Sequence, residues 1–226
     1  MFETIVVEKE GAIGRLTLNQ PDKLNPLSTQ RLQEIIKAAR WFDDQPEIKV
    51  VIVAGEGRAF SAGADLKGFG SDNNLNPRDR GDAGRRMADA LEAMRAITVV
   101  RLQGWCVGGG LVLASACDLR IAAEDAKFSI PEVDLGIPLA WGGIPRLVRE
   151  IGPALTKELV ITCRPCDAAE AKAAGFLNRV VPADELDAAV NTLARQISEK
   201  ATIPITATKR HVNAVTDQMV GSMRSW

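Results

Sequence analysis

The pattern of apolar and polar positions predicts an α/β fold. Short runs rich in β-branched residues indicate strands at 4–9, 13–18, 49–53, 98–102, 118–123, 126–130 and 178–181. Apolar residues at helical spacing between them indicate helices from Ser28 to Phe42, from Met87 to Ile97, and at 110–116, 142–151, 153–162, 167–174, 183–200 and from 203 onward. Strands that alternate with helices are typical of α/β proteins, and the C-terminal region is predicted to be helical.

Segment 68–84 interrupts this pattern. It contains Gly, Ser, Asn, Pro and Asp and almost no apolar residue. Such a composition buries too little apolar surface to fix a conformation. We therefore expect a surface loop that is mobile without ligand.

The chain of 226 residues, 46% of them hydrophobic, is long enough for one compact core with an appendage. We expect a core at 1–182 that carries the site and a helical region at 183–226. The helix at 183–200 has an apolar face made of Leu186, Ala189, Val190, Leu193 and Ile197. This face fits a contact between subunits and an intrachain core equally well.

Composition and charge exclude several classes of protein. The net charge of −1 has no basic cluster that would indicate nucleic acid binding. The longest uncharged stretch, 102–117, is too short and too rich in glycine for a membrane span. The N-terminus lacks the apolar run of a signal peptide, so a cytoplasmic location is expected.

Metal and redox chemistry are not expected either. The chain has a single histidine, which excludes multi-histidine metal centres and disfavours a Ser-His-Asp triad. Cys163 and Cys166 have the spacing of a redox motif, but they precede an alanine-rich helix and do not open a thioredoxin-like unit. We predict unpaired structural cysteines and no metal site.

Two loops rich in small residues carry the strongest functional signal. The segments AFSAGADLK (59–67) and GWCVGGG (104–110) each follow a predicted buried strand. Small residues let a ligand approach the backbone and leave N–H groups accessible. Two N–H groups that converge on one carbonyl oxygen form an oxyanion hole. Tight packing would explain one such loop, but two matched loops favour a functional site.

These loops belong to a longer series of motifs, which also includes LNQPDKLNPL (18–27), ACDLRIA (116–122), KFSIPEVDLGI (127–137) and AGFLNRVVP (174–182). In this order the series resembles the enoyl-CoA hydratase/isomerase (crotonase) superfamily over nearly the whole chain. The resemblance implies a spiral of ββα turns, trimers or dimers of trimers, and acyl-CoA thioester substrates of fatty acid metabolism. It implies no tightly bound cofactor, since coenzyme A belongs to the substrate. Superfamily members continue into further helices past the segment matching 208–210, which implies a shortened chain or a cover from a neighbouring subunit.

The resemblance also implies roles for individual residues. The N–H groups of Ala62 and Gly109 match the oxyanion hole, which polarises the thioester carbonyl and stabilises an enolate. The positions that match coenzyme A contacts are Lys23, Ala62, Gly63, Ala64, Asp65, Leu66, Lys67 and Gly109. For Lys23, a solvated turn lysine is an equally good interpretation.

One position departs from the hydratases of the superfamily, which carry two glutamates. This chain has Val112 at the first position and Glu132 at the second. Two carboxylates normally share the work of adding water, whereas one carboxylate suffices to move a proton between carbons. We therefore expect an enoyl-CoA isomerase with Glu132 as the acid/base. A 2-enoyl-CoA hydratase and an acyl-CoA-binding protein without turnover are the alternatives.

Two further residues leave alternatives open. Asp134 lies on the same side as Glu132 if the segment is extended, where it would serve as a second acid or base; otherwise it orders a turn. Trp141 follows in the next loop and either walls the acyl pocket or is an ordinary packed aromatic.

Overall fold

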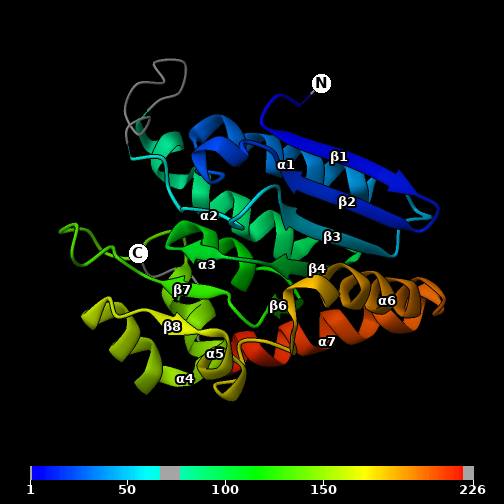
Figure 1. The fold of residues 1–226 in the computed structure, drawn as a ribbon. Coiled ribbons are helices and arrows are strands. Elements are labelled where there is room, and N and C mark those ends of the chain that lie inside the picture. The colour runs from blue at the N-terminus through cyan, green and yellow to red at the C-terminus, as the bar shows by residue number, and fades with distance from the viewer. Residues whose placement is uncertain (1, 67–76, 221–226) are drawn as a thin grey trace.

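The computed structural model describes residues 2–66 and 77–220 of the chain (Figure 1). Lys67 and residues 68–76 of the predicted loop lie outside the described residues.

The main sheet has six strands in the order β1-β2-β3-β4-β6-β9. Their bounds are β1 (Ile5–Glu10), β2 (Ile13–Leu18), β3 (Val50–Gly55), β4 (Ile97–Leu102), β6 (Leu119–Ala123) and β9 (Arg179–Val181). The predicted N-terminal hairpin is confirmed, since β1 and β2 pair antiparallel with Glu10 opposite Ile13. The other neighbours pair in parallel.

A second sheet contains β5 (Trp105–Val107), β7 (Lys127–Ser129) and β8 (Cys166–Asp167), in that order. Successive turns of the chain therefore read β4-β5-α3 and β6-β7-α4, where α3 spans Gly109–Ser115 and α4 spans Gly143–Thr162. This confirms the predicted α/β fold with ββα turns. Of this sheet, β7 confirms the strand predicted at 126–130. The strands β5 and β8 were not predicted, because strands of two or three residues are defined by their pairing with one another and not by local periodicity.

The remaining helices are η1 (Pro21–Lys23), α1 (Thr29–Asp43), α2 (Pro77–Ala93), α5 (Ala168–Ala173), η2 (Ala183–Glu185), α6 (Leu186–Ser198) and α7 (Thr202–Val220). Ser28 caps α1 as predicted, since its Oγ accepts a hydrogen bond from Arg31 N at 3.2 Å. The two helices predicted at 142–151 and 153–162 are the halves of α4, which bends at Gly152. Over the two described ranges, no helix is long and apolar enough to cross a membrane.

The loop prediction for 68–84 was wrong for its second half, because α2 begins at Pro77. Proline is favoured at the start of a helix. Ala83 and Met87 are buried one helical turn apart, so the apolar face of α2 extends further toward the N-terminus than the composition of the segment indicates. Packing against the body of the protein overrides the low hydrophobicity of this segment.

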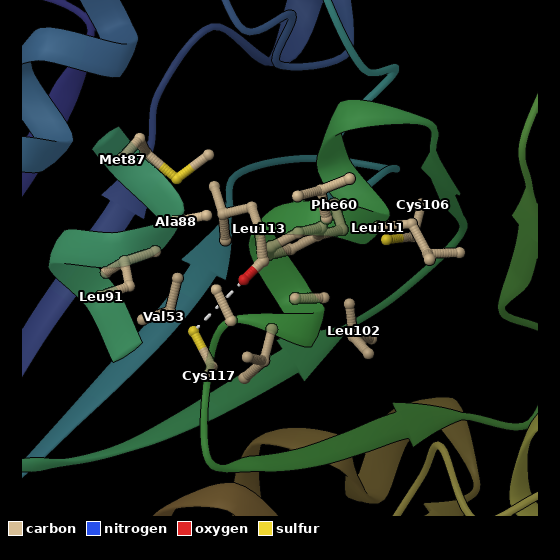
Figure 2. Close-up of a cluster of buried hydrophobic side chains, with 14 of the residues drawn as sticks. Val53, Phe60, Met87, Ala88, Leu91, Leu102, Cys106, Leu111, Leu113 and Cys117 are labelled. Carbon is tan, nitrogen blue, oxygen red and sulfur yellow. Dashed lines mark hydrogen bonds between the residues drawn. The ribbon is translucent and has the colours of Figure 1, made fainter. Parts of the chain in front are cut away.

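The two faces of the main sheet carry separate clusters of buried side chains. In β3, Val51 and Val53 join the cluster on the face covered by α1 and α2, and Val50 and Ile52 join the cluster under α6 (Figure 1). Figure 2 shows the first cluster, in which side chains of α2 and α3 meet around Val53 and Phe60. The apolar face of α6 therefore packs within the chain, as the intrachain alternative for that helix expects.

The cysteines are unpaired, as predicted. Cys106, Cys117 and Cys166 are buried, and Cys163 is partly buried. Cys117 Sγ donates a weak hydrogen bond to Leu113 O at 3.5 Å within the core (Figure 2). Burial raises the pKa of the Cys117 thiol to about 12, so this group is an inert part of the packing.

Candidate active site

The two loops rich in small residues lie against each other. Ser61 N donates a hydrogen bond to Trp105 O at 3.1 Å, and Val107 N donates one to Ser61 O at 3.0 Å. These bonds form a short parallel bridge between Ser61 and Cys106. The prediction that both loops contribute to one place in the fold is confirmed at the level of the backbone.

Glycines are needed where the loops meet. Gly63 has a φ of +87°, and a Cβ there would lie 2.7 Å from Val107 O and 3.6 Å from Gly109 N. Gly108 has a φ of +47°, and a Cβ there would overlap the carboxylate of Glu132. Both positions need a conformation that favours glycine and space that a side chain would fill. The absence of side chains thus lets Glu132 lie against the second loop.

The assignment of Ala62 to the oxyanion hole needs correction. Its N–H donates a hydrogen bond of 2.7 Å to Leu24 O and is therefore not available to a ligand. The neighbouring N–H of Gly63 donates to Ser61 Oγ at 3.1 Å. The turn at Leu24, which has a φ of 59°, was not predicted, and its carbonyl oxygen accepts the hydrogen bond from the N–H of Ala62.

Ala64 is the better candidate in the first loop. Leu27 N donates to Gly63 O, and Asp65 N donates to Leu27 O, so this pairing skips the N–H of Ala64. Within residues 2–66 and 77–220, no acceptor for the Ala64 N–H is present. Gly109 opens α3, and the first N–H groups of a helix have no acceptor inside it. Two unused backbone donors therefore come from the two loops.

Ala64 and Gly109 border one cavity of about 290 Å³. Its lining residues are Ala64, Leu66, Gly109, Val112, Glu132, Ile137, Pro138, Leu139, Ala140 and Trp141. The structure thus brings together four of the predicted site residues and adds the wall at 137–141, of which only Trp141 was considered from the sequence.

Other predicted contacts lie outside this lining. Lys23 is exposed at the end of η1, and Asp65 lies close enough to Arg31 to raise the pKa of that guanidinium. Burial has the larger and opposite effect and lowers the pKa of Arg31 to about 10. The backbone N–H groups of Ala62 and Gly63 make hydrogen bonds within the protein, so these two residues stabilise the conformation of the loop.

Glu132 is the carboxylate of the cavity. Its Oε2 atom is buried and has no hydrogen-bond partner within the described part of the chain. Burial raises the pKa of Glu132 above its ordinary value of 4.5. A carboxyl group in apolar surroundings gains a proton more readily, which moves it toward the pKa that suits a general acid or base near neutral pH. Val112 is fully buried in the same wall.

Asp134 does not accompany Glu132 in the cavity. The segment from Pro131 to Gly136 is a turn and not an extended chain, with Leu135 N donating to Pro131 O at 3.2 Å. Ile137 N closes it by donating to Glu132 O at 3.0 Å. Asp134 is exposed on this turn, so the interpretation as a turn residue is correct.

Comparisons with known proteins agree with this geometry. A probable enoyl-CoA hydratase of Mycobacterium tuberculosis is 40% identical over 212 residues, which cover 94% of this chain and 82% of that protein. A peroxisomal Delta(3,5)-Delta(2,4)-dienoyl-CoA isomerase of Arabidopsis thaliana is more distant, with 34% identity over 92% of this chain and 80% of that protein.

The fold is similar to that of solved structures. The crystal structure of an enoyl-CoA hydratase/carnithine racemase from Magnetospirillum magneticum superposes with a TM-score of 0.90. Its sequence is 31% identical, and the match covers 96% of this chain and 83% of that one. The family model for enoyl-CoA hydratase/isomerase matches residues 8–224. The chain therefore belongs to the enoyl-CoA hydratase/isomerase family and is an enzyme of the crotonase superfamily.

Proposed function

We propose that this protein is an enoyl-CoA isomerase that moves a double bond from C3–C4 to C2–C3 of an acyl-CoA thioester. The observation that carries the proposal is the composition of the cavity. Among the residues that the structure describes, its lining has one carboxylate, Glu132, and the position of a second carboxylate in hydratases is occupied by the buried Val112.

The first step is removal of a proton from C2. The thioester oxygen accepts hydrogen bonds from the N–H groups of Ala64 and Gly109, which stabilise the negative charge that develops on it. Glu132 takes the C2 proton, and the electrons delocalise over the thioester and the C3–C4 double bond. The N-terminal end of α3 at Gly109 adds a favourable partial positive charge.

The second step returns the same proton at C4. Protonation there leaves the double bond between C2 and C3 and frees Glu132 as a carboxylate. Atoms and charge balance without a co-reactant. Burial raises the pKa of Glu132, which favours transfer of the C2 proton to this carboxylate.

Hydration of a 2-enoyl-CoA is the second candidate. The name of the Mycobacterium tuberculosis relative favours it. In this reaction Glu132 has to activate water without the help of a second carboxylate, so an ordered water held by backbone groups would be required. The present lining of the cavity supplies no further acidic side chain among the described residues.

Incubation of the purified protein with matched 2-enoyl-CoA and 3-enoyl-CoA thioesters separates the two reactions. We expect conversion of the 3-enoyl to the 2-enoyl thioester, with little 3-hydroxyacyl product. In deuterium oxide, the protein should also exchange the α-protons of a saturated acyl-CoA. Rapid hydration without isomerisation would overturn the isomerase proposal and favour the hydratase.

Binding of coenzyme A and assembly remain part of the proposal. Lys23 is exposed and free to contact the phosphates. Gly63 and Asp65 adjoin the lining residue Ala64, and Leu66 lines the cavity itself. A trimer or a dimer of trimers rests on the family, because the apolar face of α6 is used within the chain. Light scattering across micromolar concentrations tests it, and a monomer throughout would contradict it.

A further inference from the structure

Trp141 occupies a slot between two glycines that come from different elements. A Cβ added at Gly84 of α2 would overlap the indole at Cγ, Cδ2 and Cε2. A Cβ added at Gly109 would overlap the opposite edge of the same ring, at Cζ3. Only glycine at both positions leaves room for this side chain in its present place.

The backbone of Trp141 is held as firmly as its ring. Arg146 is fully buried, and its Nη1 donates to Trp141 O at 3.3 Å and to Gly142 O at 3.2 Å. Its Nη2 donates to Asp89 Oδ1 at 2.9 Å and to Glu92 Oε2 at 2.7 Å, both on α2. Arg146 thus holds the backbone at Trp141, and the slot between the two glycines holds the ring.

The position of Trp141 limits the cavity. Trp141 is 8% exposed and lines the cavity together with Leu139, Val112 and the catalytic candidate Glu132. The volume of about 290 Å³ is at the lower end for small-molecule sites, which span about 300–1,000 Å³. The indole thus takes up space at the apolar wall of this small cavity.

We propose that Trp141 sets the acyl-chain length and restricts the enzyme to short acyl groups such as butyryl and hexanoyl. This inference rests on the proposed function, because it takes the apolar end of the same cavity as the acyl site. Trp141 acts on specificity alone and leaves the chemistry to Glu132.

Binding of saturated acyl-CoA thioesters tests the inference without turnover. The experiment compares the dissociation constants of butyryl-, hexanoyl-, octanoyl- and decanoyl-CoA, determined by calorimetry, between the parent and Trp141→Gly. Glycine suits the φ of 60° at this position. The parent should lose affinity beyond hexanoyl. The variant should gain roughly fourfold per added methylene, so that the octanoyl/hexanoyl preference shifts by about tenfold or more.

Two further variants test whether a change in binding reflects the size of the side chain at position 141 and not a general loss of folding. Trp141→Phe should shift the preference in the same direction by a smaller factor. Trp41→Phe makes the same change on α1, outside the lining of the cavity, and should leave the chain-length profile unchanged.

The glycine slot gives a second, independent measurement. Gly84→Ala should force the indole from its place and weaken hexanoyl-CoA binding more than butyryl-CoA binding. In the Trp141→Gly background the same alanine should have little effect, because the ring it would overlap is gone.

The outcomes separate this inference from the proposed function. Identical chain-length profiles for the parent, Trp141→Gly and Trp141→Phe would overturn the inference, even if isomerisation is observed. A chain-length profile that shifts as described, without turnover of any enoyl-CoA, would support the inference for the binding site and contradict the proposed reaction.

Discussion

Two glutamates in different regions of this molecule are both partly buried but have opposite electrostatic surroundings. Glu132 lines the cavity, where burial raises its pKa. Glu92 lies on α2 and pairs with Arg146 and Arg149 of α4. Burial also pushes its pKa up, but the two guanidinium groups outweigh this effect and leave the pKa below its ordinary value. Burial is common to both, so the presence of a cation decides which carboxylate stays charged.

The surroundings of Glu92 form an extended network of charges. Arg149 donates to Glu92 and Glu150, and Glu150 also accepts from the buried Arg120. Paired charges of this kind hold helices in place but are not free to exchange protons. The cavity has the reverse composition, with a carboxylate among apolar side chains. Reactivity is thus kept apart from the charged framework that supports it.

The largest effect is expected from Glu132→Gln, which keeps the shape of the side chain and removes its ability to accept a proton. Loss of a general acid/base should lower the isomerisation rate by about 10²–10⁴-fold. α-Proton exchange should fall in parallel, while the dissociation constant for a saturated acyl-CoA changes little. An exchange rate equal to that of the parent would show that another group carries the proton.

A large loss of stability is expected from Arg146→Ala. This change leaves Glu92 with one cation fewer and leaves Trp141 O and Gly142 O without their donor. Removal of one partner of a buried pair should lower the free energy of unfolding by about 3 kcal/mol, measured by urea denaturation.

Arg85→Ala is the matched control, since Arg85 is partly exposed and pairs with Asp82 and with Asp89, which also accepts from Arg146. An exposed pair contributes less than about 1 kcal/mol. Equal losses for Arg146→Ala and Arg85→Ala would contradict the distinction between a buried framework and surface charge.

A moderate effect is expected from Val112→Glu, which places a second carboxylate in the cavity. The pair can orient water, so the ratio of hydration to isomerisation should rise by about tenfold. Two carboxylates that share a site also raise the pKa of one of them. Product analysis by chromatography measures the ratio, and an unchanged ratio would mean that Val112 does not control the choice of reaction.

The smallest effect concerns pH. Glu132 must be deprotonated to accept the C2 proton, so kcat/KM should decline as pH falls through its raised pKa, before the ordinary value of 4.5 is reached. A flat profile down to that value would contradict the raised pKa.

The same shift affects stability in the opposite direction. A carboxyl whose pKa is higher in the folded state binds more protons there, so its contribution to stability falls as pH rises from the ordinary value through the raised one. Glu132→Gln lacks this slope and should gain stability relative to the parent as pH rises through that window. Parallel curves of unfolding free energy against pH would count against the shift.

Much of this arrangement follows from local sequence. The cap at Ser28, the N-terminal hairpin and the two loops of small residues have chemical signals within a few positions of each other. The start of α2 was missed, because the burial of Ala83 depends on packing that the polar composition of the segment conceals. The correct predictions are those whose sequence signal lies within one short segment.

The assignment of the backbone donors shows the limit most clearly. Ala62 and Ala64 are the same residue type, two positions apart in one loop. They differ because Leu24 O accepts a hydrogen bond from the N–H of Ala62, whereas Leu27 bonds to the residues on either side of Ala64 and not to Ala64 itself. These acceptors lie more than thirty positions away, so local sequence does not distinguish the two alanines. The same limit applies to Asp134, because the segment that would place it beside Glu132 if extended is a turn in the structure.

Each wall of the cavity belongs to a different part of the spiral. Ala64 follows β3, Val112 lies on α3, Glu132 follows β7 and Trp141 precedes α4. A substitution in one part can therefore change one property while the others persist. On the roles proposed for Val112 and Trp141, a lineage can change its reaction at position 112 and its substrate size at position 141 in separate steps, each through a single replacement.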